Sequence, residues 1–279
     1  PRGSDYTVSI TTPGNALSYQ WKRNEQEISG ATMSDFEIDS IHYQNMGVFT
    51  VDVTSGIVPN LVLTSHPMEV LATSPISITV IGQDDLLFQE GEGHLLIIGE
   101  PGMPFDTVDT QSPVEGEFVF ETTVLGDYLV AIVPEDTTTY LPTYYENTFL
   151  WEEADTLRFR EGIEDTIYMT IRPVPPGPDD GDYSLHGIVE SDFPEDSRIE
   201  ARKRIKRTGC SVRRFRSAGR GEDGIWELVA YVYTDDNGEF NFDFLPPDVY
   251  RFNVEYPGIP MDPESFVEFE LGGGDKPRF

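Results

Sequence analysis

The residues with the clearest chemical potential are Asp and Asn side chains in predicted loops, whose oxygens could bind a metal ion. The clearest set is Asp235, Asp236 and Asn237, which directly precede Gly238. Calcium prefers carboxylate and amide oxygens, so this run is a candidate calcium site. Asp and Asn before Gly are also typical of a tight turn, and the run does not follow the spacing of an EF-hand loop. A turn is the preferred interpretation, so we expect no cofactor, and calcium stays open as the alternative.

Catalytic motifs are absent from the sequence. The four histidines do not occur at metal-ligand spacing, and there is no Gly-x-Ser-x-Gly elbow and no phosphate-binding glycine loop. Carboxylates are so abundant that their number alone does not exclude a glycosidase site built from a pair of Asp or Glu residues. However, no motif in the sequence positions a particular pair. The single cysteine, Cys210, cannot form an internal disulfide. We interpret it as a buried, incidental thiol rather than a nucleophile, and we predict a protein that is not an enzyme.

Charge is distributed very unevenly along the chain. The net charge is −31, which disfavours nucleic acid and anionic membranes as partners. The segment from 198 to 220 nevertheless contains ten basic residues and one acidic residue, a net charge of +9. We predict that it binds a partner. The candidate residues are Arg202, Lys203, Arg204, Lys206, Arg207, Arg213, Arg214 and Arg216.

Three interpretations of this basic segment stay open. It balances the charge of its own acidic domain, or it adheres to an acidic neighbour such as another copy, another domain or an anionic glycan. Nucleic-acid binding is the third and is disfavoured by the acidic remainder. Alternation in Ser211–Arg216 and a return strand at Trp226–Tyr233 predict an elongated hairpin insertion over 198–233 that projects from its domain.

An internal repeat indicates the elements that hold these residues. Gly116 is followed by two phenylalanines and, twelve residues on, by Tyr128, and Gly238 stands at the same distance from Tyr250. The glycine suits a turn with positive φ, and phenylalanines two apart share one face of a strand. We expect each copy to form a hairpin, in which the strand that begins at the tyrosine pairs back.

This motif resembles the carboxypeptidase regulatory-like (transthyretin-like) module. The second copy, Thr234–Tyr250, carries the resemblance most fully, although Asp248 or Val249 replaces the usual glycine. The resemblance implies a seven-stranded, non-catalytic β-sandwich of the kind appended to secreted proteins.

The N-terminal part resembles the immunoglobulin-like domains of bacterial surface proteins. Tyr19-Gln20-Trp21 corresponds to the strand with the core tryptophan, and the run from Asn45 to Val51 corresponds to the strand that carries the corner tyrosine. Phe49 replaces that tyrosine. Val51 replaces the second cysteine, so the resemblance implies aliphatic packing where a disulfide would be.

Together these patterns predict an all-β chain of tandem β-sandwich domains. We expect an immunoglobulin-like domain over 5–73, a transthyretin-like (prealbumin-like) domain over 74–173, a linker over 174–182, and a second transthyretin-like domain over 183–273. The proline-rich linker should be extended and semi-rigid. The sequence shows no signal peptide, so we expect a mature protein or an excised fragment. Pro1–Ser4 resembles the remnant of a purification tag.

The expected function is that of a non-enzymatic structural or adhesive segment of an extracellular bacterial surface protein or filament. No apolar run reaches the roughly 18 residues needed for a membrane span. Tyr140–Tyr145, with Trp151 and Ala154, resembles a stretch of large secreted Bacteroidetes proteins, many exported by type IX secretion. The alternative is a carbohydrate-binding module that uses Tyr144, Tyr145 and Trp151 as a stacking platform, unless these rings fill a core or an interdomain joint. We expect the main partners to be proteins, either other copies of this chain or neighbouring domains of the same surface assembly, and a glycan is the alternative partner.

Overall fold

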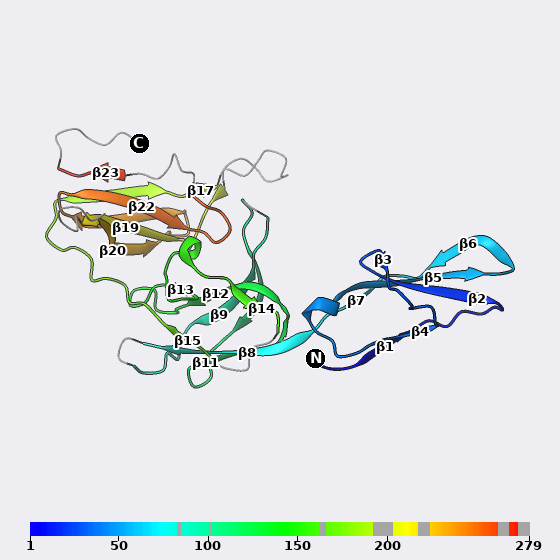
Figure 1. Cartoon of the computed structure of the whole chain (residues 1–279). Coiled ribbons are helices and arrows are strands. Elements are labelled where there is room, and N and C mark those ends of the chain that lie inside the picture. The colour runs from blue at the N-terminus through cyan, green and yellow to red at the C-terminus, as the bar shows by residue number, and fades with distance from the viewer. Residues whose placement is uncertain are drawn as a thin grey trace. The chain divides into compact units, whose positions relative to one another are not determined.

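The chain is almost entirely β-structure, which confirms the predicted class of tandem β-sandwich domains. The computed structural model describes residues 1–82, 85–100, 102–161, 166–191, 203–216, 224–261 and 268–272 (Figure 1). Within them the helical elements are two single turns of 3-10 helix, η1 (Tyr43–Asn45) and η2 (Trp151–Glu153).

The described chain forms two compact units. Unit 1 comprises Pro1–Ile78, Val119–Tyr128 and Leu157–Ile167, and unit 2 comprises Thr79–Phe118, Leu129–Thr156 and Tyr168–Phe279. The predicted boundaries differ from this division, because residues of the predicted second domain fall in both units. The three predicted domain ranges therefore stay a proposal.

The first seven strands form two sheets. One sheet pairs β1 with β4, and the other has the order β3-β2-β5-β6, with β7 also pairing β5. The strands are β1 (Tyr6–Ser9), β2 (Leu17–Arg23), β3 (Gln26–Glu27), β4 (Asp35–Ile38), β5 (Gly47–Ser55), β6 (Val58–Thr64) and β7 (Met68–Val70).

A tryptophan lies at the centre of the core between these strands. Trp21 is buried with Val8, Ala31 and Val51, and its indole N–H donates to the Met33 carbonyl at 3.0 Å. Val51 lies directly opposite Trp21 in the β2–β5 register. Phe49 is also buried. The two positions that depart from the immunoglobulin pattern are thus filled by apolar packing.

The next eight strands form two further sheets. One has the order β10-β9-β12-β13, with β14 also pairing β12, and the other has the order β11-β8-β15. The strands are β8 (Thr73–Ile81), β9 (Glu92–Ile97), β10 (Asp106–Gln111), β11 (Glu117–Val124), β12 (Gly126–Val133), β13 (Thr143–Tyr144), β14 (Leu157–Phe159) and β15 (Ile167–Thr170).

The last eight strands belong to unit 2. β16 pairs β21, β17 pairs β18, and a four-stranded sheet has the order β20-β19-β22-β23. The strands are β16 (Tyr183–Ile188), β17 (Glu190–Ser191), β18 (Lys203–Arg204), β19 (Gly209–Arg216), β20 (Ile225–Tyr233), β21 (Glu239–Leu245), β22 (Val249–Glu255) and β23 (Glu268–Glu270).

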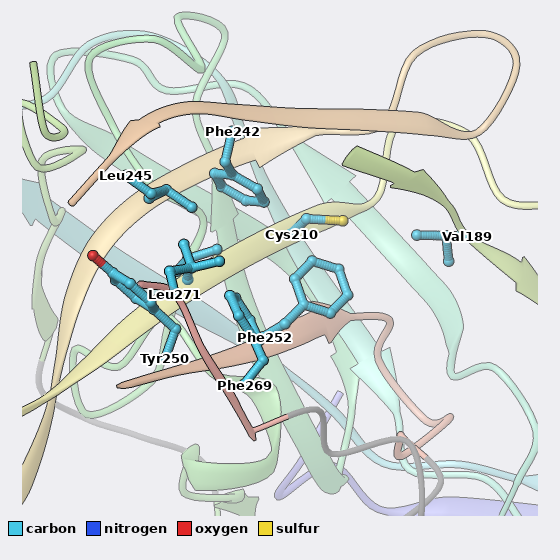
Figure 2. Packing of buried hydrophobic residues seen from close by; sticks show 9 residues of the cluster. Val189, Cys210, Phe242, Leu245, Tyr250, Phe252, Phe269 and Leu271 are labelled. Atoms are coloured by element: carbon cyan, nitrogen blue, oxygen red, sulfur yellow. The ribbon is translucent and has the colours of Figure 1, made fainter. Parts of the chain in front are cut away.

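Figure 2 shows the core that these C-terminal strands enclose. Phe242 and Leu245 come from β21, Tyr250 and Phe252 from β22, and Cys210 from β19. These side chains converge, and Cys210 has no exposed surface. Burial raises the pKa of its thiol to about 12, so the buried-thiol interpretation agrees with the structure.

The internal repeat is present in three dimensions, but its hairpins are not. Gly116 and Gly238 have φ values of 81° and 75°, as predicted for turns that favour glycine. However, β11 and β12 lie in different sheets, and so do β21 and β22. The chain therefore crosses from one sheet to the other at each corner. The hairpin prediction was wrong because a short turn between two apolar strands also suits such a crossing.

A tyrosine fixes each crossing. The Tyr128 hydroxyl donates to the Val124 carbonyl at 2.6 Å, and the Tyr250 hydroxyl donates to the Pro246 carbonyl at 2.8 Å. Both bonds span four residues. Such a bond, known as a tyrosine corner, closes the bend between sheets of a sandwich.

The proline-rich segment is bonded at both ends. The Val174 N–H donates to the Thr139 carbonyl, and the Gly181 N–H donates to the Phe244 carbonyl at 3.0 Å. These bonds tie the segment to the loop between β12 and β13 and to β21.

Candidate functional site

The basic segment is built into the C-terminal sheet. β19 and β20 form an antiparallel hairpin, as the alternation predicted, but β19 also pairs with β22 along Gly209–Arg214. Cys210 and Val212 of β19 lie in the core. Within the described residues, this hairpin therefore does not project from its domain. The remainder of 198–223 falls mostly outside them.

The opposite face of this sheet is unusually polar. Because Cys210 and Val212 face the core, Gly209, Ser211 and Arg213 must face the other way. The same alternation turns two residues of β20 and two of β22 onto this outer face. The outer face is thus defined by Gly209, Ser211, Arg213, Tyr231, Tyr233, Asn253 and Glu255.

An apolar segment that precedes the linker covers this outer face. Leu141, Phe149 and Leu150 form a buried cluster with Tyr231, and the rings of Phe149 and Tyr231 meet edge to face with centroids 6.4 Å apart. The Trp151 backbone N–H donates to Glu255 Oε2 at 3.1 Å. We call this contact within unit 2 the joint.

Glu255 is the most perturbed carboxyl group of the joint. Its residue is only 7% exposed. Burial raises its pKa to about 8, against the smaller lowering effect of the hydrogen bond from Trp151. A neutral glutamic acid is therefore the dominant form near pH 7. Since shifted carboxyl groups often occur at functional sites, this group is a candidate functional residue.

Three tyrosines surround this carboxyl group. Burial raises the pKa of Tyr144 and of Tyr231 well above the usual value, and the Glu255 charge adds to both shifts. Burial also raises the pKa of Tyr233 to about 12. A hydrogen-bonding contact with Tyr231 partly offsets the rise at Tyr233, and no other partner of these two hydroxyls is found among the described residues. The two hydroxyls therefore form a polar pair inside the joint.

A cavity of about 260 Å³ opens beside these groups. We call it the joint cavity. Its wall includes Glu255 and four tyrosines, Tyr144, Tyr231, Tyr233 and Tyr256. Arg207 and His94 also line it, and most of the rest of the wall is apolar. The cavity lies entirely within unit 2.

Three of the predicted partner-binding arginines already have acidic neighbours in this chain. Arg213 is nearly buried; it donates to Asn253 Oδ1 at 2.8 Å and lies 3.9 Å from Glu153. Arg214 lies 3.7 Å from Asp248, and Arg216 bonds Glu227 at 3.0 Å. These contacts fit the interpretation of internal charge balance.

The other predicted basic residues lie before β19. Arg204, Lys206 and Arg207 are exposed, and within the described chain none of them forms an ion pair. Lys203 lies in β18, which pairs with β17. Arg202 lies outside the described residues. Arg204, Lys206 and Arg207 are thus the predicted residues with charge most accessible to a partner.

The predicted stacking platform is not one exposed surface. Tyr144 is 4% exposed and packs with Leu96, Leu129 and Ala131, so its ring is covered. Trp151 is half-buried, and its ring meets Phe105 edge to face at 5.3 Å. Tyr145 is partly exposed. The packing of Tyr144 and Trp151 corresponds to the alternative in which these rings fill a joint.

The predicted calcium ligands form a turn. Asp235 Oδ1 accepts from the N–H groups of Asn237 and Glu239 at 2.7 and 2.9 Å. These bonds lower the pKa of Asp235. Asp236 follows in the same turn. In the part of the chain that the structure describes, no group of three His, Cys, Asp or Glu side chains is placed to hold a metal ion.

Sequence reasoning missed Glu255, Tyr231 and Tyr233. All three alternate with apolar residues in their strands, as side chains on a solvated face do. The signal for their burial lies in another segment, Leu141–Trp151, which covers them. A local pattern in β20 or β22 therefore could not show it.

Comparisons with known proteins do not assign the chain to a family. No protein-family model matches it, and no curated protein matches it. Among solved structures, the Bacillus anthracis TIE protein is 13% identical, with 96% of this chain and 50% of that chain covered and a TM-score of 0.31. This chain thus spans half the length of that protein.

Two further solved structures are similarly distant. The streptococcal ancillary pilin is 12% identical over 97% of this chain and 96% of that chain, with a TM-score of 0.24. Three N-terminal domains of the bacteriophage RB49 outer capsid protein Hoc are 11% identical over 91% and 86%, with a TM-score of 0.25. At such scores the likenesses support no conclusion about function. In the described residues, no helix is long and apolar enough to cross a membrane.

Proposed function

We propose that the chain is a non-enzymatic structural segment of an extracellular bacterial surface protein or filament. One observation carries the proposal: the apolar segment that contains Leu141, Phe149 and Leu150 covers the outer face of the C-terminal sheet. Unit 2 is therefore one continuous body rather than a series of independent domains joined by flexible linkers. A stalk or spacer needs such a stiff joint. The type IX secretion context and the carboxypeptidase regulatory-like type belong to the same proposal.

Mechanical unfolding tests this role. The full chain would be placed between two marker domains and pulled in a single-molecule force experiment. A spacer should resist extension until unit 2 unfolds in few, cooperative steps, because the joint couples its strands. Gradual extension of unit 2 at low force, before any marker domain unfolds, would contradict the spacer role.

A second role, adhesion between copies, is favoured by the exposed cations. Arg204, Lys206 and Arg207 lie on a chain of net charge −31, so an acidic face of another copy is a complementary surface. The expected contact is electrostatic and weakens at high salt. The alternative partner is a carbohydrate. It would stack on Tyr145 and Trp151, which are partly exposed, but not on Tyr144, whose ring is buried.

Sedimentation velocity at low and high salt tests adhesion. Replacing Arg204, Lys206 and Arg207 by serine should abolish any self-association seen at low salt. A control variant with Arg2, Arg158 and Arg172 replaced by serine loses the same charge from other exposed sites and should still associate. Equal loss in both variants would show that net charge, rather than this surface, controls the association.

A further inference from the structure

Strand β6 lies at the edge of its sheet in unit 1 (Figure 1). Within the described residues it pairs with β5 alone. The Ser65 N–H, just after β6, donates to the Val51 carbonyl at 3.0 Å, and successive residues of a strand direct their backbone groups to opposite edges. The N–H and C=O groups of Val62 and Thr64 therefore point to the free edge, where they are available to another strand.

The same strand and the turn before it expose a group of large apolar side chains. Their exposed fractions lie between 49% and 72%, and the residues are Ile57, Val58, Leu61, Val62 and Leu63. Val62 and Leu63 are neighbours in a strand, so they point to opposite faces, and both faces of β6 are thus uncovered. Single exposed apolar residues are ordinary, but a contiguous group of them marks an interaction surface.

The β6 edge is also free of charge. Residues 53–68 contain no Asp, Glu, Lys or Arg, although a quarter of the chain is charged. The flanking Asp52 is neutralised by Lys22, at 2.6 Å. Native edge strands usually carry charge, which prevents pairing with another chain. Two chains of net charge −31 repel each other, and an uncharged strand of this kind is a surface through which they can still meet.

We propose that β6 of one copy pairs antiparallel with β6 of a second copy about a twofold axis. A twofold contact joins the same strand of both copies, so the free backbone groups and the apolar side chains meet their equivalents. A stable interface uses about 20–30 residues on each side, so this smaller contact should be weak, with a dissociation constant on the order of 100 µM. It is separate from adhesion through the exposed cations and does not depend on the spacer role.

Sedimentation equilibrium of the full chain up to about 1 mM tests the pairing. Wild type should form dimers even at high salt, because apolar and backbone contacts are not screened. Val62→Lys brings like charges together at the contact and should weaken dimerisation at least about tenfold. Met33→Lys makes the same charge change at a side chain of unit 1 that is 70% exposed, and it should associate like wild type.

Three results would overturn the proposal. They are a monomer at every concentration, equal effects of Val62→Lys and Met33→Lys, and loss of the dimer at high salt, which would assign association to the exposed cations instead. Wild-type chain that stays monomeric but sediments with phosphatidylcholine vesicles, unlike Val62→Lys, would assign the strand to a membrane surface and would also overturn it.

Disulfide cross-linking places the contact at β6. The variants Val62→Cys, Leu63→Cys and Thr64→Cys are each oxidised and analysed on a non-reducing gel. At least one should form a covalent dimer, because opposed Cα atoms of paired antiparallel strands lie about 4.5–5.5 Å apart, within reach of a disulfide. The native Cys210 is fully buried and does not compete. Met33→Cys, the control, should stay monomeric. A dimer that cross-links at none of the three positions would refute the β6 contact.

Discussion

Glu255 is a carboxyl group in surroundings that disfavour its charge. Its position opposite Gly209 in the β19–β22 register turns it onto the outer face, and the segment around Leu150 and Trp151 then removes it from water. The residue therefore stays protonated near neutral pH. The same burial that makes it a candidate site makes it a source of pH dependence in folding.

Stability should fall as pH rises through the titration range of Glu255. Its pKa is about 8 in the folded chain against an ordinary value of 4.5. Between these values the folded state binds more protons than the unfolded state, so its advantage is lost as pH increases. The loss is on the order of a few kcal/mol. Chemical denaturation at about pH 5 and pH 9 should show Glu255→Gln losing less stability than wild type. An identical loss in both would contradict the assignment.

The corner tyrosines should each stabilise the fold through one hydroxyl. Tyr250→Phe removes the bond to the Pro246 carbonyl and should cost about 1 kcal/mol. Tyr168→Phe changes a ring that is 70% exposed and serves as the control. Thermal unfolding followed by near-UV circular dichroism would measure both. Equal melting temperatures for the two variants would show that the corner bond contributes nothing.

At the scale of elements, β19 shows how one strand serves two surfaces. Cys210 and Val212 fill the core, while Gly209 and Ser211 leave space on the outer face for Tyr231. Within β19 itself, the basic residues begin at Arg213, after these positions. Along β19, side chains that must be apolar for the core therefore alternate with side chains that must be small or polar for the outer face.

Gly209→Ala should disrupt the outer face without touching the core. The new methyl group would lie 1.7 Å from the Tyr231 hydroxyl, so the ring must move. We expect a loss of roughly 1–3 kcal/mol, as for other overpacked sites. Gly99→Ala, where nothing lies within 4 Å, is the control. Chemical denaturation of both variants measures the difference. A Gly209→Ala protein as stable as the control would show that the joint tolerates displacement of this ring.

The sequence predicted individual strands better than their partners. Alternation located the strands near Ser211–Arg216 and Trp226–Tyr233, and the glycines of the repeat marked turns with positive φ. Whether the strand after Tyr128 or Tyr250 pairs back or crosses to another sheet depends on contacts between distant segments. A period of two shows which side chains share a face, but it does not show what covers that face.

At the scale of the whole molecule, burial within unit 2 balances the repulsion of an acidic chain. The net charge of −31 opposes compact structure, and Cys210 offers no internal disulfide to counter it. The apolar cluster of Leu141, Phe149, Leu150 and Tyr231 is thus a main stabilising contact of the joint. Stability of the C-terminal sheet should depend on residues more than fifty positions earlier in the chain.

Labelling of Cys210 measures this dependence. The thiol is fully buried and has a pKa of about 12, so a thiol reagent at about pH 8 reacts with it only when the C-terminal strands open. Phe149→Ala removes a buried ring from the joint at a cost of about 3–5 kcal/mol, so Cys210 should be labelled much faster.

Phe215→Ala is the control for this labelling experiment, because it truncates a ring of β19 that is 40% exposed and should change the rate far less. If Phe149→Ala labels at the wild-type rate, the C-terminal strands are stable without the joint. In that case the coupling within unit 2, on which the spacer role depends, would be absent.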